Sequence, residues 1–119
     1  MFGFLGGGAD KISGVDAVSQ AKNGKLVILD VRDAMEVSHS GKAKGAVHIP
    51  MMMLNMQADP SSPECNKKLN VDTPIANYCA TGARSGFAAR SLKKMGYKTV
   101  YNLGGLRNWA NAGGKIVRA

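Results

Sequence analysis

Cys79 is the residue best suited to nucleophilic chemistry, because it opens a short loop between two predicted regular elements. A predicted strand at 75–78 ends at this cysteine, and an amphipathic pattern starts at Ser85. The backbone amides of a short curled loop can converge as an anion-binding nest, and the positive end of the following helix adds to the same field. The sequence therefore predicts a Cys79 thiol with a lowered pKa, reactive without a neighbouring histidine.

The loop after this cysteine supplies the groups that we expect around the sulfur and its substrate. Its members are Cys79, Ala80, Thr81, Gly82, Ala83 and Arg84, with Ser85 at the start of the helix. Gly82 permits the left-handed turn that so short a loop requires. Arg84 brings a forked cation, which either holds the helix start and the loop carbonyls or contacts an oxyanion. Neither His39 nor His48 needs a catalytic role, and we expect both at surface or turn positions.

Charged residues at the end of the preceding predicted strand are candidates for supporting roles. Asp30, Arg32 and Asp33 follow that strand, and ligands bind beyond the carboxyl ends of strands in open α/β sheets. Arg32 and Lys42 are interpreted either as groups that attract an anionic substrate or as solvated surface residues. Asp30 and Asp33 either hold Arg84 or cap a helix.

The other sulfur-bearing residues have plainer interpretations. The chain has two cysteines without a disulfide-framework spacing, so we expect Cys65 and Cys79 to be free thiols. Cys65 is interpreted as a bystander and, in the alternative, as a resolving thiol. The methionines at 51–56 are expected to fill gaps in a helix covering the sheet rather than to bind a soft metal.

Helical and extended patterns alternate along the chain, which favours an α/β domain with a largely parallel sheet. A long connection at 57–74 holds three prolines and at most one helical turn. Helices are expected at 13–22, 34–40, 51–56, 85–95 and 106–112, strands at 26–29, 46–49, 75–78 and 97–101, and a turn at 104–105.

Length and composition indicate one globular domain, with 119 residues of which 45% are hydrophobic. We interpret 1–11 as an N-terminal tail, either disordered or a short packing strand, and 12–119 as the domain. No apolar run is long enough to span a membrane, and 1–8 lack the features of a targeting segment, so we expect a cytoplasmic protein.

The net charge of +8 favours the binding of anions. Because the basic residues are scattered and the chain has only seven aromatic residues, we expect small anions rather than nucleic acid.

Four motifs, in order along the chain, make the sequence resemble the rhodanese family over roughly residues 12–116. They are 30–33, then Gly41 with 45–50, then 79–85, and finally 103–105 with Trp109 and Gly113. The resemblance implies a three-layer α/β domain, with a central, mostly parallel five-stranded sheet flanked by helices. It also implies that Cys79 is the catalytic residue and that no metal or organic cofactor is needed.

The activity that this resemblance implies is that of a sulfurtransferase of the thiosulfate type. Sulfane sulfur would pass from thiosulfate or a persulfide donor to cyanide in an assay, or to a thiol in the cell, through a persulfide on Cys79. Proteins are possible donors or acceptors of that sulfur, whereas neither nucleic acid nor a membrane is an expected partner. The chain departs from the family at Lys42, where many members have histidine, and at 113–115, where Gly-x-Pro is common.

Loop length separates two chemistries on this fold. Rhodanese-like sulfurtransferases have six residues from cysteine to arginine, as here from Cys79 to Arg84, whereas related dual-specificity phosphatases and arsenate reductases have one more. A tighter ring of amides fits the terminal sulfur of a persulfide and crowds a phosphoryl group. A non-enzymatic interaction or sulfur-carrier module on the same fold is the main alternative function, and a phosphatase or arsenate reductase is the second.

Overall fold

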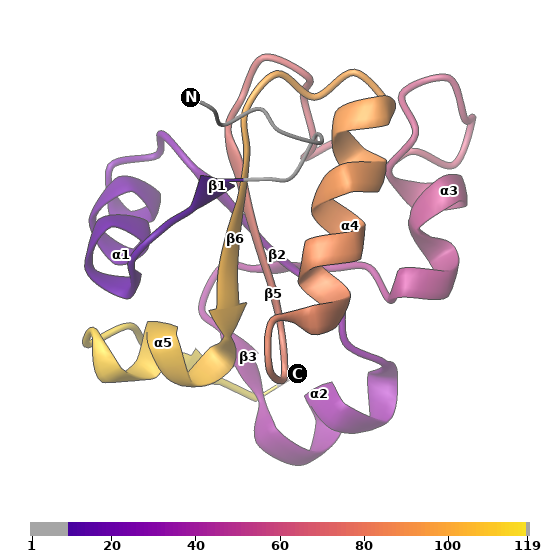
Figure 1. The fold of residues 1–119 in the computed structure, drawn as a ribbon. Helices are drawn as coiled ribbons and strands as arrows, with labels where there is room; N and C mark the ends of the chain where they lie inside the picture. Colours follow the sequence, from indigo (N-terminus) through magenta and orange to yellow (C-terminus); the bar gives the residue numbers. More distant parts are fainter. Residues whose placement is uncertain (1–9, 119) are drawn as a thin grey trace.

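A five-stranded parallel sheet with helices on both faces forms the body of the molecule, which a computed structural model describes for residues 10–118 (Figure 1). The strand order is β1-β6-β5-β2-β4, and all four neighbouring pairs run parallel. This arrangement confirms the predicted fold class. The strands are β1 (Asp10–Lys11), β2 (Val27–Asp30), β4 (Val47–His48), β5 (Ile75–Cys79) and β6 (Val100–Gly105).

Two hydrophobic clusters, one on each face, hold the helices to this sheet. Helices α3 (Leu54–Gln57) and α4 (Ala83–Lys94) contribute Leu54 and Leu92 to one cluster. Helices α1 (Gly14–Lys22) and α5 (Leu106–Asn111) contribute Ala17 and Trp109 to the other. Helix α2 (Ala34–Ser40) lies near the end of the sheet toward which β6 points (Figure 1).

The central strand β5 is buried along its whole length. Because successive side chains of a strand point to opposite faces, Ile75 and Cys79 join one cluster while Ala76 and Tyr78 join the other. A strand covered on both faces carries mostly apolar side chains, and the one polar residue within this strand, Asn77, donates from Nδ2 to the Tyr101 carbonyl at 3.1 Å. The carboxyl end of this strand delivers Cys79 to the loop that begins α4.

The helices lie close to their predicted positions, and their caps explain why. Ser13 accepts a hydrogen bond from the Asp16 amide at 3.1 Å and so begins α1. The methionine-rich segment forms a single 3₁₀ turn, η2 (Met51–Met53), followed by α3. No helix among residues 10–118 is long and apolar enough to cross a lipid bilayer.

The last strand of the sheet differs from its prediction, because β6 covers 100–105 rather than 97–101. Tyr97 instead buries its ring and donates a hydrogen bond from its hydroxyl to the Ala58 carbonyl at 2.6 Å. Gly104 and Gly105, predicted as a turn, pair with Tyr78 and Cys79 across an irregularity in the register. The pairing continues because β5 offers hydrogen-bonding partners up to its last residue.

A second, two-stranded antiparallel sheet was not predicted from the sequence. It joins β3 (Lys42–Ala43) to β7 (Ile116–Val117). Strands of two residues carry too little periodicity to be recognised. At the other end of the chain, Asp10 and Lys11 pair with Tyr101 and Asn102 as an edge strand, which was not predicted. Residues 1–9, expected to belong to the tail, lie outside the described part of the chain.

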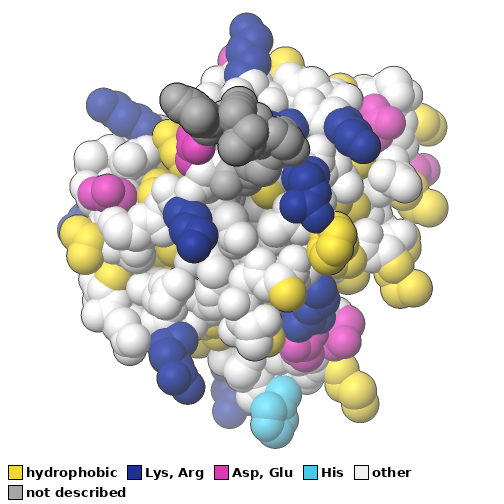
Figure 2. Space-filling model, viewed as in Figure 1, with side chains coloured by type: hydrophobic (Ala, Val, Ile, Leu, Met, Phe, Trp, Pro, Cys, Tyr) yellow, Lys and Arg dark blue, Asp and Glu magenta, His cyan; other side chains and the backbone are white. Residues whose placement is uncertain are grey.

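Basic side chains on the face drawn in Figure 2 lie at separate places rather than in one patch, and some of them lie beside acidic side chains. This distribution agrees with the scatter seen in the sequence, where 16 basic residues outnumber eight acidic ones.

Candidate active site

The sulfur of Cys79 lies buried inside a ring of hydrogen-bond donors formed by the loop. The Gly82 amide donates to Sγ at 3.0 Å, and the Ser85 amide donates at 3.4 Å. The Ser85 hydroxyl lies 3.6 Å from the same sulfur. The loop predicted to form an anion-binding nest thus directs its amides at the predicted nucleophile.

The sulfur also caps helix α4. Gly82 occupies the N-cap position with a φ of 103°, and it has no side chain to bond the exposed amides of the first turn. Cys79 Sγ accepts from the amide of Ser85, the third residue of the helix, which is the role that a serine or aspartate oxygen usually fills. The positive end of the helix therefore faces the sulfur directly.

Opposing effects act on the acidity of this thiol. Burial alone would raise the pKa of Cys79, because it penalises the charged thiolate. Hydrogen bonds from the Ser85 hydroxyl and amide, and from the amides of Gly82 and Thr81, outweigh burial and lower the pKa below its ordinary value. The direction agrees with the prediction from loop geometry, and no histidine takes part.

Arg84 is held by Glu36, a partner that sequence reasoning missed. Arg84 Nη1 bonds Glu36 Oε1 at 2.6 Å, and Nη2 bonds Oε2 at 2.8 Å, so the pair is bidentate and joins α4 to α2. The hydrogen bonds from Arg84 lower the pKa of Glu36 to about 2. Holding Arg84 was one of the two roles predicted for Asp30 and Asp33, and neither carboxylate has this role, because both bind other groups.

Asp33 is the N-cap of α2, which was one of its two predicted roles. Its carboxylate accepts from the Glu36 amide at 2.9 Å, and Glu36 Oε1 accepts from the Asp33 amide at 3.2 Å. This reciprocal capping box orients Glu36 toward Arg84. A capping box at 33–36 was the signal in the sequence that identifies Glu36.

Asp30 and Arg32 form a buried ion pair instead of serving substrate. Arg32 Nη2 bonds Asp30 Oδ2 at 2.7 Å, and the two side chains are only 4% and 0% exposed. Arg32 also donates to Ser40 Oγ and to the Gly41 carbonyl, both at 2.6 Å. Neither predicted role for Arg32, substrate attraction or a solvated position, fits these contacts, because its guanidinium folds back onto Asp30 and ties β2 to the start of β3.

Lys42 and His48 make local hydrogen bonds, whereas the side chain of His39 is exposed. Lys42 Nζ donates to the Ala46 carbonyl at 2.9 Å and so closes the turn between β3 and β4. His39 lies exposed on α2, as expected. His48 lies partly exposed in strand β4 rather than in a turn, and its Nε2 is 2.7 Å from the Arg32 carbonyl oxygen.

Asn102, on the neighbouring strand β6, braces the loop and was missed by sequence reasoning. Its Oδ1 accepts from Ser85 Oγ at 2.6 Å and from the Gly104 amide at 2.9 Å. Its Nδ2 donates to the Gly82 carbonyl at 3.2 Å. The signal available in the sequence was one amide side chain between the hydrophobic residues Tyr101 and Leu103.

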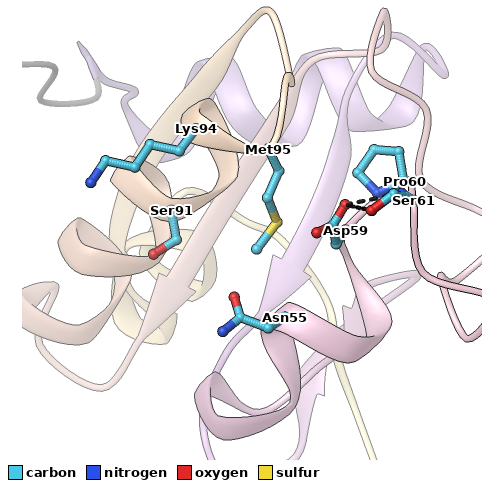
Figure 3. A pocket seen from close by; sticks show the side chains of 7 residues that line it. All are labelled: Asn55, Asp59, Pro60, Ser61, Ser91, Lys94 and Met95. Carbon is cyan, nitrogen blue, oxygen red and sulfur yellow. Dashed lines mark hydrogen bonds between the residues drawn. The ribbon is translucent and has the colours of Figure 1, made fainter.

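The surface has one hollow beside the loop and another at the far end of α4. The first, of about 350 Å³, is lined by Thr81 and Gly82 of the loop and by Lys11 of β1, among others. The second, of about 500 Å³, lies between α3 and the carboxyl-terminal end of α4 (Figure 3). Its lining carries no cysteine and no histidine: Asn55, Asp59, Pro60, Ser61, Ser91, Lys94 and Met95. The hollow beside the loop is therefore the one that is relevant to Cys79.

Both cysteines are free thiols, as predicted. Cys65 is half-buried in the connection between α3 and β5, whereas Cys79 is fully buried. The loop geometry described above involves Cys79 alone.

Comparisons with known proteins agree with the fold. The chain is 33% identical over 82 residues to the thiosulfate sulfurtransferase PspE of Escherichia coli, covering 69% of this chain and 72% of that protein. It is 36% identical over 93 residues to the uncharacterized protein YqhL of Bacillus subtilis, covering 77% of this chain. The chain spans 64% of the length of YqhL.

A solved structure of a Rhodopseudomonas palustris protein of unknown function, described as a possible tyrosine phosphatase, superposes with a TM-score of 0.79. It is 34% identical, and the match covers 92% of this chain and 85% of that one. The family model for the rhodanese-like domain matches residues 15–112, from the second residue of α1 to the residue that follows α5. The chain is therefore a member of the rhodanese-like domain family.

Proposed function

We propose that the protein is a sulfurtransferase that carries sulfane sulfur as a persulfide on Cys79. The observation that supports this function best is the six-residue loop whose amides converge on one buried sulfur of lowered pKa. Such a ring stabilises a small sulfur anion by fixed hydrogen-bond donors. We infer thiosulfate or a persulfide as the donor and a thiol as the acceptor, with cyanide as a convenient acceptor in an assay.

The reaction has two displacements at sulfur. The Cys79 thiolate attacks the outer sulfur of thiosulfate, the sulfur–sulfur bond of the donor breaks, and sulfite leaves with the electron pair. The product is the persulfide anion Cys79–S–S⁻. An acceptor thiolate or cyanide then attacks the outer sulfur, forms an acceptor persulfide or thiocyanate, and releases Cys79 as the thiolate that began the cycle.

Phosphate ester hydrolysis is a second candidate, because the similar Rhodopseudomonas palustris protein is described as a possible tyrosine phosphatase. The loop from Cys79 to Arg84 argues against it, since the ring is one residue shorter than in the phosphatases of related fold. In addition, the Glu36 carboxylate engages two of the five N–H donors of Arg84 and offsets its charge, which leaves less of both for a phosphoryl group.

Intact-protein mass spectrometry after incubation with thiosulfate tests the proposal. We expect a gain of one sulfur atom in the wild type and in Cys65→Ser, and no gain in Cys79→Ser. Addition of cyanide should then remove the sulfur and release thiocyanate. A protein that gains no sulfur but hydrolyses p-nitrophenyl phosphate would contradict the proposal, and one that holds the sulfur without passing it on would be a carrier module.

A further inference from the structure

The hydroxyl of Ser85 has more acceptors around it than it has protons. Ser85 Oγ lies 2.6 Å from Asn102 Oδ1, 3.1 Å from the Gly82 carbonyl and 3.5 Å from the Gly104 carbonyl. The fourth neighbour is Cys79 Sγ at 3.6 Å. A serine hydroxyl donates one hydrogen bond, so these four atoms compete for a single proton.

Asn102 holds that proton while Cys79 is a neutral thiol. Its Oδ1 is the nearest of the four acceptors and lies at the distance of a short, well-formed O–H···O hydrogen bond. With its proton turned toward Asn102, the Ser85 oxygen presents lone pairs to the sulfur, and the thiol of Cys79 donates to it. The proton of the neutral thiol thus has an acceptor, the Ser85 oxygen.

A sulfur anion needs the opposite arrangement, in which Ser85 donates to the sulfur. Rotation of the hydroxyl about its carbon–oxygen bond is enough to produce it. Asn102 Oδ1 is not left without a partner when this happens, because it still accepts from the Gly104 amide at 2.9 Å. The amide group of Asn102 cannot swing away with the proton, because its Nδ2 is bonded to the Gly82 carbonyl at 3.2 Å.

We propose that Asn102 is a positioning residue that holds the Ser85 proton away from Cys79 while the sulfur is a thiol and releases it to the sulfur when the sulfur is an anion. The exchange moves one hydroxyl proton between two hydrogen bonds and involves no net proton transfer. Its use in catalysis rests on the proposed sulfur transfer, in which the thiol of Cys79 must first become the attacking thiolate. The exchange itself concerns the thiol alone and needs no sulfur donor.

Asn102→Asp tests this role in a Cys65→Ser background, where Cys79 is the remaining thiol. The substitution keeps the size of the side chain but makes it a stronger acceptor, so it should retain the Ser85 proton. We expect the midpoint of the pH profile for alkylation of Cys79 by iodoacetamide to rise by about one pH unit, a roughly tenfold loss of thiolate near neutral pH.

Asn108→Asp is the matched control for the added charge. Asn108 Nδ2 donates to the Leu103 carbonyl at 2.8 Å, and its side chain lies beside Gly104 without a bond to Ser85. Its profile should shift less than that of Asn102→Asp, and the difference between the two shifts should shrink in a Ser85→Ala background, where there is no hydroxyl proton to hold. Equal shifts with Ser85 present, or a difference that is as large without Ser85, would overturn the proposal.

A measurement on unsubstituted Asn102 covers the case in which the Asn102→Asp variant does not fold. In ¹⁵N nuclear magnetic resonance spectra, the side-chain amide signals of Asn102 should move with the midpoint at which Cys79 titrates. The signals of Asn108 should stay nearly fixed, and an Asn102 that is equally insensitive would refute the exchange. Failure to form a persulfide with thiosulfate, with the Asn102 signals still responding, would refute the proposed function and leave this inference intact.

Discussion

Cys79 is stabilised as an anion by its neighbours although burial opposes its charge. Burial raises the pKa of the thiol, and the donors of Ser85, Gly82 and Thr81 lower it further than burial raises it. The same donors stabilise helix α4, since two of them are amides at its first turn. Charge on the sulfur and stability of the fold are therefore linked at this residue.

The stability of the folded protein should depend on pH through Cys79. Because the folded pKa is lowered, the thiolate contributes stability that is fully present above the unfolded pKa of about 8.5 and is lost as pH falls through the folded pKa. We compare the free energy of unfolding of Cys65→Ser with that of Cys65→Ser/Cys79→Ser. The difference, the first value minus the second, should rise with pH and level off above the unfolded pKa of about 8.5. Urea denaturation at several pH values measures it, and a difference that stays constant with pH would contradict the lowered pKa.

Glu36 affects stability in acid for a related reason. Bonding to Arg84 holds its pKa at about 2 instead of 4.5, so the pair contributes stability above pH 4.5 that is lost as pH falls through about 2. Glu36→Gln should cost about 1 kcal/mol at neutral pH, since the pair is about one-third exposed and water screens it. Thermal unfolding should show a smaller acid dependence in this variant. Glu64→Gln, at an exposed position, is the control and should change neither quantity.

At the scale of elements, the loop depends on tight backbone geometry between β5 and α4. Gly82 has a φ of 103°, and a Cβ added there would lie 3.4 Å from the Cα of Gly104. Gly45 also has a positive φ, of 82°, but has nothing within 4 Å of the same added atom. Substitutions at these two glycines can therefore distinguish the effect of backbone strain, which both share, from the effect of crowding in the loop, which only Gly82 has.

Gly82→Ala and Gly45→Ala should both lower stability by about 1 kcal/mol, because each forces a side chain into the left-handed region. Gly82→Ala should in addition slow alkylation of Cys79, since the Gly82 amide would move from the sulfur. We expect at least a severalfold loss in rate for Gly82→Ala and none for Gly45→Ala. Equal rates in the two variants would show that the loop does not need its present shape.

The elements that position the loop were predictable because each buries a recognisable apolar pattern. The run at 75–78 and the periodicity from Phe87 to Met95 placed Cys79 between a strand and a helix before any coordinates were considered. Glu36 and Asn102 were missed because their partners lie 48 and 17 residues away in the chain, and no local pattern carries such a pairing. Arg32 was misread for the opposite reason, since its partner Asp30 is only two residues away and draws it inward.

At the scale of the whole molecule, one tyrosine joins the two sheets. Tyr78 is fully buried, donates from its hydroxyl to Asp30 Oδ2 at 2.6 Å and accepts from the Ala43 amide of β3 at 3.0 Å. Burial and the bond to Asp30 raise the pKa of this phenol. The hydroxyl therefore stays protonated and can donate to the carboxylate across the working pH range.

Tyr78→Phe should lower the free energy of unfolding by about 1–3 kcal/mol, because it leaves the Ala43 amide without this partner and Asp30 with one fewer donor. Urea denaturation measures the change. Tyr101→Phe, half-buried on the adjacent strand, is the control and should cost less. A loss in Tyr78→Phe no larger than in the control would mean that water replaces the hydroxyl at no cost.

The distributed positive charge has a kinetic consequence under the proposed function. A net charge of +8 raises the concentration of anions near the surface, and Lys11 borders the hollow beside the loop. The rate of persulfide formation with dianionic thiosulfate should fall as salt is raised, whereas alkylation by neutral iodoacetamide should hardly change. Lys11→Glu should reduce the rate of persulfide formation with thiosulfate at low salt. An unchanged rate in the variant would show that thiosulfate does not reach Cys79 past Lys11.

The bonds from Glu36 and Asn102 to the loop also bear on when the thiol becomes reactive. A ribosome makes the chain from its amino terminus, so the whole loop emerges before the strand that carries Asn102. Until β6 has joined the sheet, the Gly82 carbonyl and the Ser85 hydroxyl lack their partner on that strand. A nascent or truncated chain that ends before residue 100 therefore contains the complete motif but not the activated sulfur, and reactivity of Cys79 reports completion of the fold.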